Sequence, residues 1–316
     1  RPLAVLCHTY RNPDYRAGEE GAIGLSMHHD PRETRRLSLT IRVTDGRALV
    51  WEETWPEASF GPAEGKSFTS RFLAPAAKAT KTIRFQATLR AEGCVVDEWT
   101  RELRIHPEKL NLRLPDSFAV LDPDGVVRGL FDRHGITGGR YAESFEALSR
   151  LRGLETVWLS FPLAKIPVAA WRRMRSWCLS FAAKGGRVVI DKAPAAVLAD
   201  MPVKIVPAKG FAFTGENAIE LTYVYNHAPH HPLAEGFSDE ALSLWGEDCY
   251  LAHSAFEIPQ EGNCVPLFLG GSAESGLCAS PFMELPVGKG GLLLSSLELF
   301  EKLSESPVPG ELLRRI

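Results

Sequence analysis

Histidine and carboxylate side chains gather in one stretch of the second half of the chain. His227, His230 and His231 lie within five residues of each other, and Asp248 follows downstream. Imidazole and carboxylate groups exchange protons near neutral pH, so these four residues are a candidate ligand-binding site or a non-standard hydrolase or transferase site. The prolines between the histidines prevent a helix that would align them on one face. The same pattern is therefore also typical of an exposed polar loop.

Aromatic rings indicate a second kind of site. The chain has seven tryptophans, whose flat rings provide large apolar contact surfaces that can stack on sugars. Trp245 is a candidate sugar-stacking residue or a buried anchor. Trp51, Trp55 and Trp99 belong to the predicted sandwich of the first half and open the alternative of a carbohydrate-binding module. Most tryptophans occur in apolar patterns that are typical of cores.

The serines lack the sharp turn that activates a nucleophile in many α/β enzymes. That turn has the pattern Gly-x-Ser-x-Gly between a strand and a helix. Ser160 ends an apolar run but is followed by Phe-Pro-Leu, and Ser272 and Ser275 have no glycine two residues later. We therefore expect no catalytic residue within this chain.

Composition argues against nucleic-acid, membrane and metal chemistry. The net charge is -3, which gives no general attraction to polyanions. The six cysteines are scattered without the close spacing of a metal site, and we expect no metal and no cofactor. The segment 288–291, Gly-Lys-Gly-Gly, is flanked by apolar residues and predicts a hairpin turn rather than a phosphate loop. The cysteine pattern favours a cytoplasmic over a periplasmic or secreted location.

The first 106 residues predict a β-sandwich. Apolar and polar residues alternate over several short runs, as in half-buried strands. Asp45-Gly46 and Glu92-Gly93 are hairpin turn signals. The predicted strands cover residues 22–27, 37–43, 48–52, 66–72, 82–89 and 95–105. The spacing favours an immunoglobulin-like sandwich over 1–106, followed by a linker over 107–116.

Residues 117–316 predict a three-layer α/β domain of the flavodoxin-like kind. Apolar runs at 118–121, 156–161 and 187–190 predict buried strands. Between the last two, Pro167 begins a helix with Trp171 and Met174 on its apolar stripe. This strand–helix–strand unit implies a parallel sheet. Further strands are expected at 203–206, 219–224, 264–269, 278–285 and 291–297.

The chain is expected to be a module of a larger protein. It begins without Met, and its last residues predict the start of a helix. Pro309 suits the first helical turn, while Leu312, Leu313 and Ile316 begin an apolar face. We interpret this as a C-terminal helix that is interrupted by the end of the chain.

The second half resembles the C-terminal region of glycoside hydrolases related to the family 2 β-galactosidases. The likeness is carried by the segments 231–237, 242–248, 280–290 and 294–297 and by Pro307. In that family, immunoglobulin-like sandwiches and a catalytic barrel can precede a domain similar to class I glutamine amidotransferases. The catalytic glutamates belong to the barrel, so the resemblance transfers no catalytic residue to this chain.

The resemblance implies a non-catalytic accessory region of a carbohydrate-active enzyme. Its expected partners are the rest of a parent polypeptide, further copies of the chain, or carbohydrate. Its expected roles are domain packing, oligomerisation or the shaping of a sugar site. The carbohydrate-binding module and the hydrolase or transferase with a His/Asp site remain the alternatives.

Overall fold

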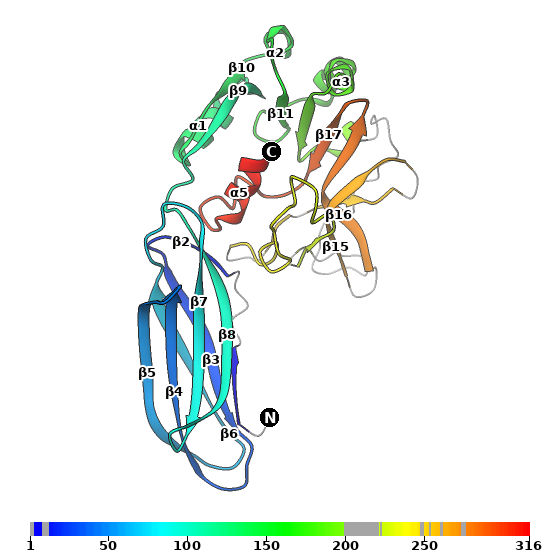
Figure 1. Cartoon of the computed structure of the whole chain (residues 1–316). Helices are drawn as coiled ribbons and strands as arrows, with labels where there is room; N and C mark the ends of the chain where they lie inside the picture. Colours follow the sequence, from blue (N-terminus) through cyan, green and yellow to red (C-terminus); the bar gives the residue numbers. More distant parts are fainter. Residues whose placement is uncertain are drawn as a thin grey trace. The chain divides into compact units, whose positions relative to one another are not determined.

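The chain folds into two compact, strand-rich units. The computed structural model describes residues 3–7, 13–198, 221, 223–246, 250–252, 254–259, 262–272 and 276–316. The first unit is Arg1–Glu108 and the second is Lys109–Ile316 (Figure 1). Within the described part of the chain, no helix combines the length and the apolar character that crossing a bilayer requires.

Two sheets enclose one apolar core in the first unit. The smaller sheet has the strand order β1-β3-β6, and the larger has the order β2-β8-β7-β4-β5. The strands are β1 (Leu3–Cys7), β2 (Asp14–Arg16), β3 (Glu20–His29), β4 (Arg35–Asp45), β5 (Ala48–Phe60), β6 (Glu64–Leu73), β7 (Lys81–Ala91) and β8 (Cys94–His106). Alternate residues of both sheets, such as Leu25 and Ile41, point into the shared core.

Most strands of the first unit follow from the sequence. All six predicted strands lie within β3 to β8. Both hairpin turns are confirmed, because Asp45 pairs with Ala48 and Ala91 pairs with Cys94 around them. The short strands β1 and β2 were not predicted.

A mixed sheet forms the centre of the second unit. Its strands are β9 (Leu112–Leu121), β10 (Ile136–Ala142), β11 (Thr156–Ser160), β12 (Arg187–Asp191), β13 (Tyr225–Asn226), β14 (Phe256–Glu257), β15 (Val265–Ser272), β16 (Gly276–Val287) and β17 (Gly290–Ser295). The order is β10-β9-β11-β12-β17-β16-β15-β13, with β14 on β16. The five neighbouring strands β10, β9, β11, β12 and β17 run parallel to one another. Strand β16 pairs antiparallel with β17, and β15 pairs antiparallel with β16.

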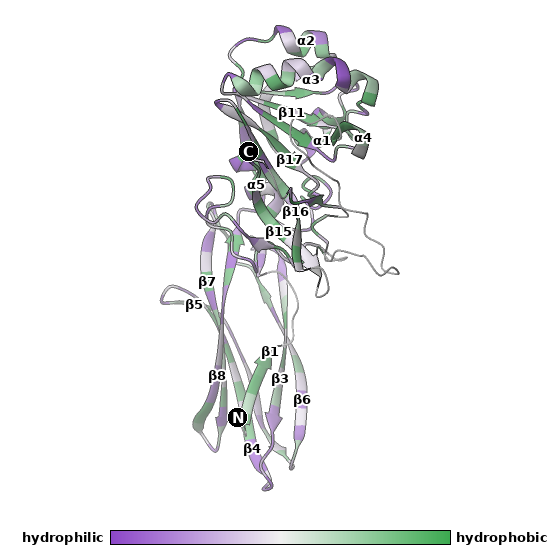
Figure 2. Ribbon diagram, turned by 90° about the vertical axis from the view of Figure 1, so that its right-hand side faces the viewer, coloured by the Kyte–Doolittle hydropathy of each residue, from purple (hydrophilic) through white to green (hydrophobic). Residues whose placement is uncertain are grey.

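Helices pack on both faces of this sheet. Helices α1 (Val126–Arg133) and α5 (Val308–Arg315) share one core with Val120 and Trp158. Helices α2 (Phe145–Arg150), α3 (Val168–Ala183) and α4 (Ala195–Leu198) share the other core with the alternate residues of the same strands. Because both faces are covered, the central strands are apolar on both sides, and Figure 2 shows β11 and β17 in hydrophobic colours.

The predicted strand–helix–strand unit is confirmed as β11, α3 and β12. The 288–291 hairpin is also confirmed, since Val287 pairs with Gly290. Strand β9 begins at Leu112, within the segment 107–116 that the sequence predicts as a linker, and Pro115 lies inside this strand. The expected strand at 203–206 and residues 219, 220 and 222 of that at 219–224 lie outside the described residues.

Candidate site at the carboxyl edge of the parallel sheet

The carboxyl ends of the parallel strands meet at one edge of the second unit. In register, Ser160 of β11 pairs with Asp191 of β12, and Asp191 pairs with Ser295 of β17. Open parallel sheets bind ligands outside this edge, where the loops leave the strands. The residues that end β9, β10, β11 and β12 are therefore the candidate site.

A buried hydrogen bond joins two of these strand ends. The Ser160 hydroxyl donates to Asp191 Oδ2 at 2.8 Å, and both residues are at most 1% exposed. Asp191 Oδ1 has no hydrogen-bond partner among the described residues. Burial raises the pKa of Asp191 to about 7, against the opposing effects of the Lys192 charge and the Ser160 hydrogen bond. A carboxyl group with such a pKa can exchange protons, but this one is closed off from solvent.

Asp122, which follows β9, supports the neighbouring helix instead of facing solvent. Its two carboxylate oxygens accept hydrogen bonds from the backbone N–H groups of Val127 at 3.0 Å and Arg128 at 2.9 Å. These bonds satisfy donors in the first turn of α1, which have no partner within the helix. Asp122 is 4% exposed and therefore has a structural role at this edge.

A pocket opens beside these buried groups. Its volume is about 300 Å³, and its lining comes from the loops after β9, β10 and β11 and from the start of α3. The lining residues are Leu121, Pro123, Asp124, Ser144, Phe145, Glu146, Ala164, Lys165, Ile166, Pro167, Ala170, Arg173 and Met174. The pocket lies at the end of β9, which has β10 on one side and β11 on the other. The chain therefore passes from β9 to the neighbour on one side and then crosses to the neighbour on the opposite side. This change of direction is the usual ligand position in such sheets.

The loop that carries Lys165 is held in a defined conformation. Ala164 N donates to the carbonyl of Ser160, and Ile166 N donates to that of Phe161, which folds the loop back onto the end of β11. Lys165 itself has a φ of 48°, in the left-handed region that is unfavourable for side chains other than glycine. Such strain persists where the surrounding structure fixes the backbone, and it clusters at functional sites.

Of the predicted histidine site, the structure describes the three histidines. His227 and His230 are exposed, whereas His231 is half-buried with its Nε2 2.9 Å from Glu284 Oε2. Glu284 pairs with Leu293 of β17. Asp248 lies outside the described residues. Among the described residues, no group of three or more His, Cys, Asp or Glu side chains is arranged to hold a metal ion.

The sugar-stacking interpretation of Trp245 is wrong. The side chain is 0% exposed in the core under α1 and α5, and its Nε1 donates to the carbonyl of Ala241 at 3.0 Å. A ring enclosed in this way cannot stack on a ligand. Trp51, Trp55 and Trp99 are partly buried against the core of the first unit, where Trp55 stacks on Phe68 with ring centroids 4.3 Å apart.

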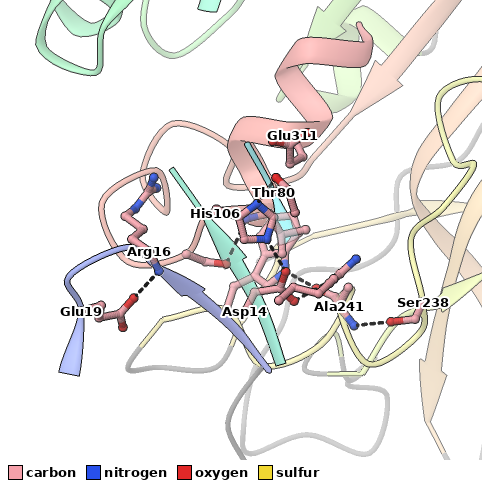
Figure 3. Close-up of polar contacts among 12 residues, drawn as sticks. Asp14, Arg16, Glu19, Thr80, His106, Ser238, Ala241 and Glu311 are labelled. Atoms are coloured by element: carbon pink, nitrogen blue, oxygen red, sulfur yellow. Dashed lines mark hydrogen bonds and ion pairs between the residues drawn. The ribbon is translucent and has the colours of Figure 1, made fainter. Parts of the chain in front are cut away.

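The first unit contains a buried polar cluster that the sequence did not indicate. Figure 3 shows His106 between Asp14 and Thr80: its Nε2 lies 2.5 Å from Asp14 Oδ1 and its Nδ1 lies 3.1 Å from Thr80 Oγ1. Arg104 donates to the second oxygen of Asp14 at 2.7 Å. The order hydroxyl, imidazole, carboxylate is that of a catalytic triad. Asp14 and His106 are only 2% and 4% exposed, however, so the cluster satisfies buried polar groups at the ends of β2 and β8.

Sequence reasoning missed the Ser160–Asp191 pair, although a signal was present. Both residues directly follow apolar runs, and the predicted parallel pairing of those runs places their last residues side by side. The pocket had no comparable signal, because it depends on how three separate loops converge.

Comparison with known proteins gives only weak similarities. No family model and no curated protein matches the chain. A β-glucosidase from Listeria innocua matches with a TM-score of 0.26 and 10% identity, over 33% of this chain and 16% of that protein. The CARDB domain of PF1109 from Pyrococcus furiosus matches with a TM-score of 0.26 and 19% identity, over 33% of this chain and 94% of the domain. Similarities at these TM-scores carry no argument about function.

Proposed function

We propose that this chain is a non-catalytic accessory region of a carbohydrate-active enzyme of the family 2 β-galactosidase type. The carbohydrate assignment rests on the sequence resemblance of residues 117–316. The non-catalytic assignment rests on the carboxyl edge of the parallel sheet, where the chemistry of related folds takes place.

The finer fold assignments belong to the same proposal. In order along the sequence, the parallel strands β9, β10, β11, β12 and β17 lie in the spatial order 2-1-3-4-5. That order is typical of flavodoxin-like folds, which supports a flavodoxin-like, glutamine-amidotransferase-like second unit. Two sheets around one core support an immunoglobulin-like first unit.

The observation that carries the non-catalytic assignment is the burial of the Ser160 hydroxyl. It lies at the end of β11, but its hydrogen bond goes to Asp191 and its side chain is inaccessible to solvent. A nucleophile must reach the substrate. Ser160 and Asp191 instead join two strand ends and stabilise the sheet.

The accessory role involves contacts with further protein surfaces. Among the described strands, β5, β6 and β10 each pair with a neighbour on one side only. Such edge strands offer unpaired backbone donors and acceptors to another chain or domain. We propose that the rest of a parent polypeptide, or further copies of the chain, cover part of these edges.

Turnover assays test the proposal. The purified chain, with Ser160→Ala as the matched variant, is incubated with a panel of aryl glycosides and aryl esters, and release of the aryl group is followed. We expect rates at the level of the buffer for both proteins. Turnover that is well above this background, and that Ser160→Ala or another single substitution abolishes, would overturn the proposal.

A further inference from the structure

The pocket at the carboxyl edge has the size and lining of a small-molecule site. Its volume of about 300 Å³ falls within the range of such sites, which combine apolar walls with a few polar groups. Leu121, Ala164, Ile166 and Met174 are buried and form apolar wall, and the ring of Phe145 is half-buried beside them. The pocket can therefore enclose the apolar body of a ligand.

Charged side chains of both signs line the pocket. Lys165, in the loop after β11, and Arg173, on α3, are the cationic lining residues. Asp124 and Glu146, from the connections after β9 and β10, are the acidic ones. All four side chains are exposed, and none forms an ion pair within the described residues. Their charges are thus available to a ligand.

We propose that this pocket binds a small organic anion, whose carboxylate or phosphate group contacts Lys165 and Arg173. Charge-assisted hydrogen bonds from a guanidinium and an ammonium are the strongest contacts that the lining offers. The apolar part of the ligand packs against Phe145 and the buried wall. Hydroxyl or ammonium groups of the ligand donate to Asp124 and Glu146. The inference rests on the pocket alone and holds whether or not the chain serves a carbohydrate-active enzyme.

Calorimetric titration of the whole chain tests the inference. The probes are benzoate and phenyl phosphate, with benzyl alcohol as the neutral analogue of similar size. We expect both anions to bind more tightly than the alcohol. The comparison between the two anions shows whether carboxylate or phosphate is preferred. Equal binding of the anions and the alcohol, or no binding of any probe at millimolar concentration, would overturn the inference.

Three variants locate the binding site. Arg173→Gln removes a charge from the pocket and should weaken anion binding about tenfold, the effect of losing one charge-assisted hydrogen bond. Lys184→Gln removes an equal charge from the opposite end of α3, outside the pocket lining, and should leave the affinity unchanged. Ala170→Phe fills the pocket and should abolish binding. Equal affinities for Arg173→Gln and Lys184→Gln, or unchanged binding to Ala170→Phe, would contradict the proposed position.

Discussion

Asp191 shows how one buried group connects stability with pH. Its carboxyl group lies at the end of a parallel strand, accepts one hydrogen bond from Ser160 and leaves its other oxygen unpartnered among the described residues. Burial penalises the charged form, so the pKa rises from 3.8 to about 7. The folded protein therefore holds this proton more tightly than the unfolded chain does.

The first prediction concerns the pH dependence of the free energy of unfolding. Because the folded pKa is raised, the contribution of Asp191 to stability is complete below about pH 4 and is lost as the pH rises through about 7. The shift of about three pKa units corresponds to a loss on the order of 4 kcal/mol. Urea unfolding at pH 4.5 and 7.5 measures it, and Asp191→Asn should remove this part of the dependence. The exposed Asp116→Asn is the matched control. Parallel pH profiles for wild type and Asp191→Asn would contradict the assignment.

At the residue scale, contacts between polar side chains were harder to predict from the sequence than the burial of apolar ones. The sequence identified Trp171 and Met174 as core residues of a helix, because the helical period alone places them on one stripe. It did not place His231 beside Glu284 or His106 between Asp14 and Thr80, because these pairs are 53, 92 and 26 residues apart in the chain. Local patterns contain no information about such contacts.

At the element scale, the long periodic segments were predicted and the short ones were not. Helix α1 has eight residues and is preceded by Gly125, which provides no side-chain cap. Neither a sustained period nor a cap signal therefore marks it in the sequence. Strand β10 contains Gly138 and Gly139, which sequence patterns associate with turns. In the structure both glycines have positive φ at a bulge, where a Cβ on Gly138 would lie 2.4 Å from the carbonyl oxygen of Leu114. The glycines thus permit the close approach of β10 to β9.

Helix α5 contributes three apolar side chains to a core of the second unit. Leu312 and Leu313 are 0% and 5% exposed and share a core with Leu293 and Leu297, while Ile316 packs against the same core. Deleting residues 309–316 removes the burial of these three apolar side chains, roughly 4.5 to 9 kcal/mol at about 1.5 to 3 kcal/mol for each. Typical domains have a total stability of about 5 to 15 kcal/mol.

We therefore expect this deletion to make the second unit melt early or aggregate while the first unit keeps its transition. Differential scanning calorimetry of the full and shortened chains measures both transitions, and the first unit is the internal control. An unchanged melting profile would show that α5 does not stabilise the sheet.

At the scale of the whole molecule, the two units have separate apolar cores. One core lies between the sheets of the first unit, and two cover the opposite faces of the mixed sheet in the second. In the sequence, strands with alternating apolar and polar residues give way to a strand–helix–strand pattern, and the prediction of two domains rests on that change. The polar groups at the strand ends are largely buried, and the accessible chemistry of the carboxyl edge is that of a binding pocket.

The accessibility of Ser160 tests this account most directly. Intact-mass spectrometry after incubation with an aryl fluorophosphonate, which labels activated serines covalently, compares the wild-type chain with Ser160→Ala. The account predicts no adduct on the folded wild-type protein, because the Ser160 hydroxyl is buried against Asp191. A stoichiometric adduct on the wild type that is absent from Ser160→Ala would show a reactive, accessible nucleophile and would contradict the non-catalytic assignment.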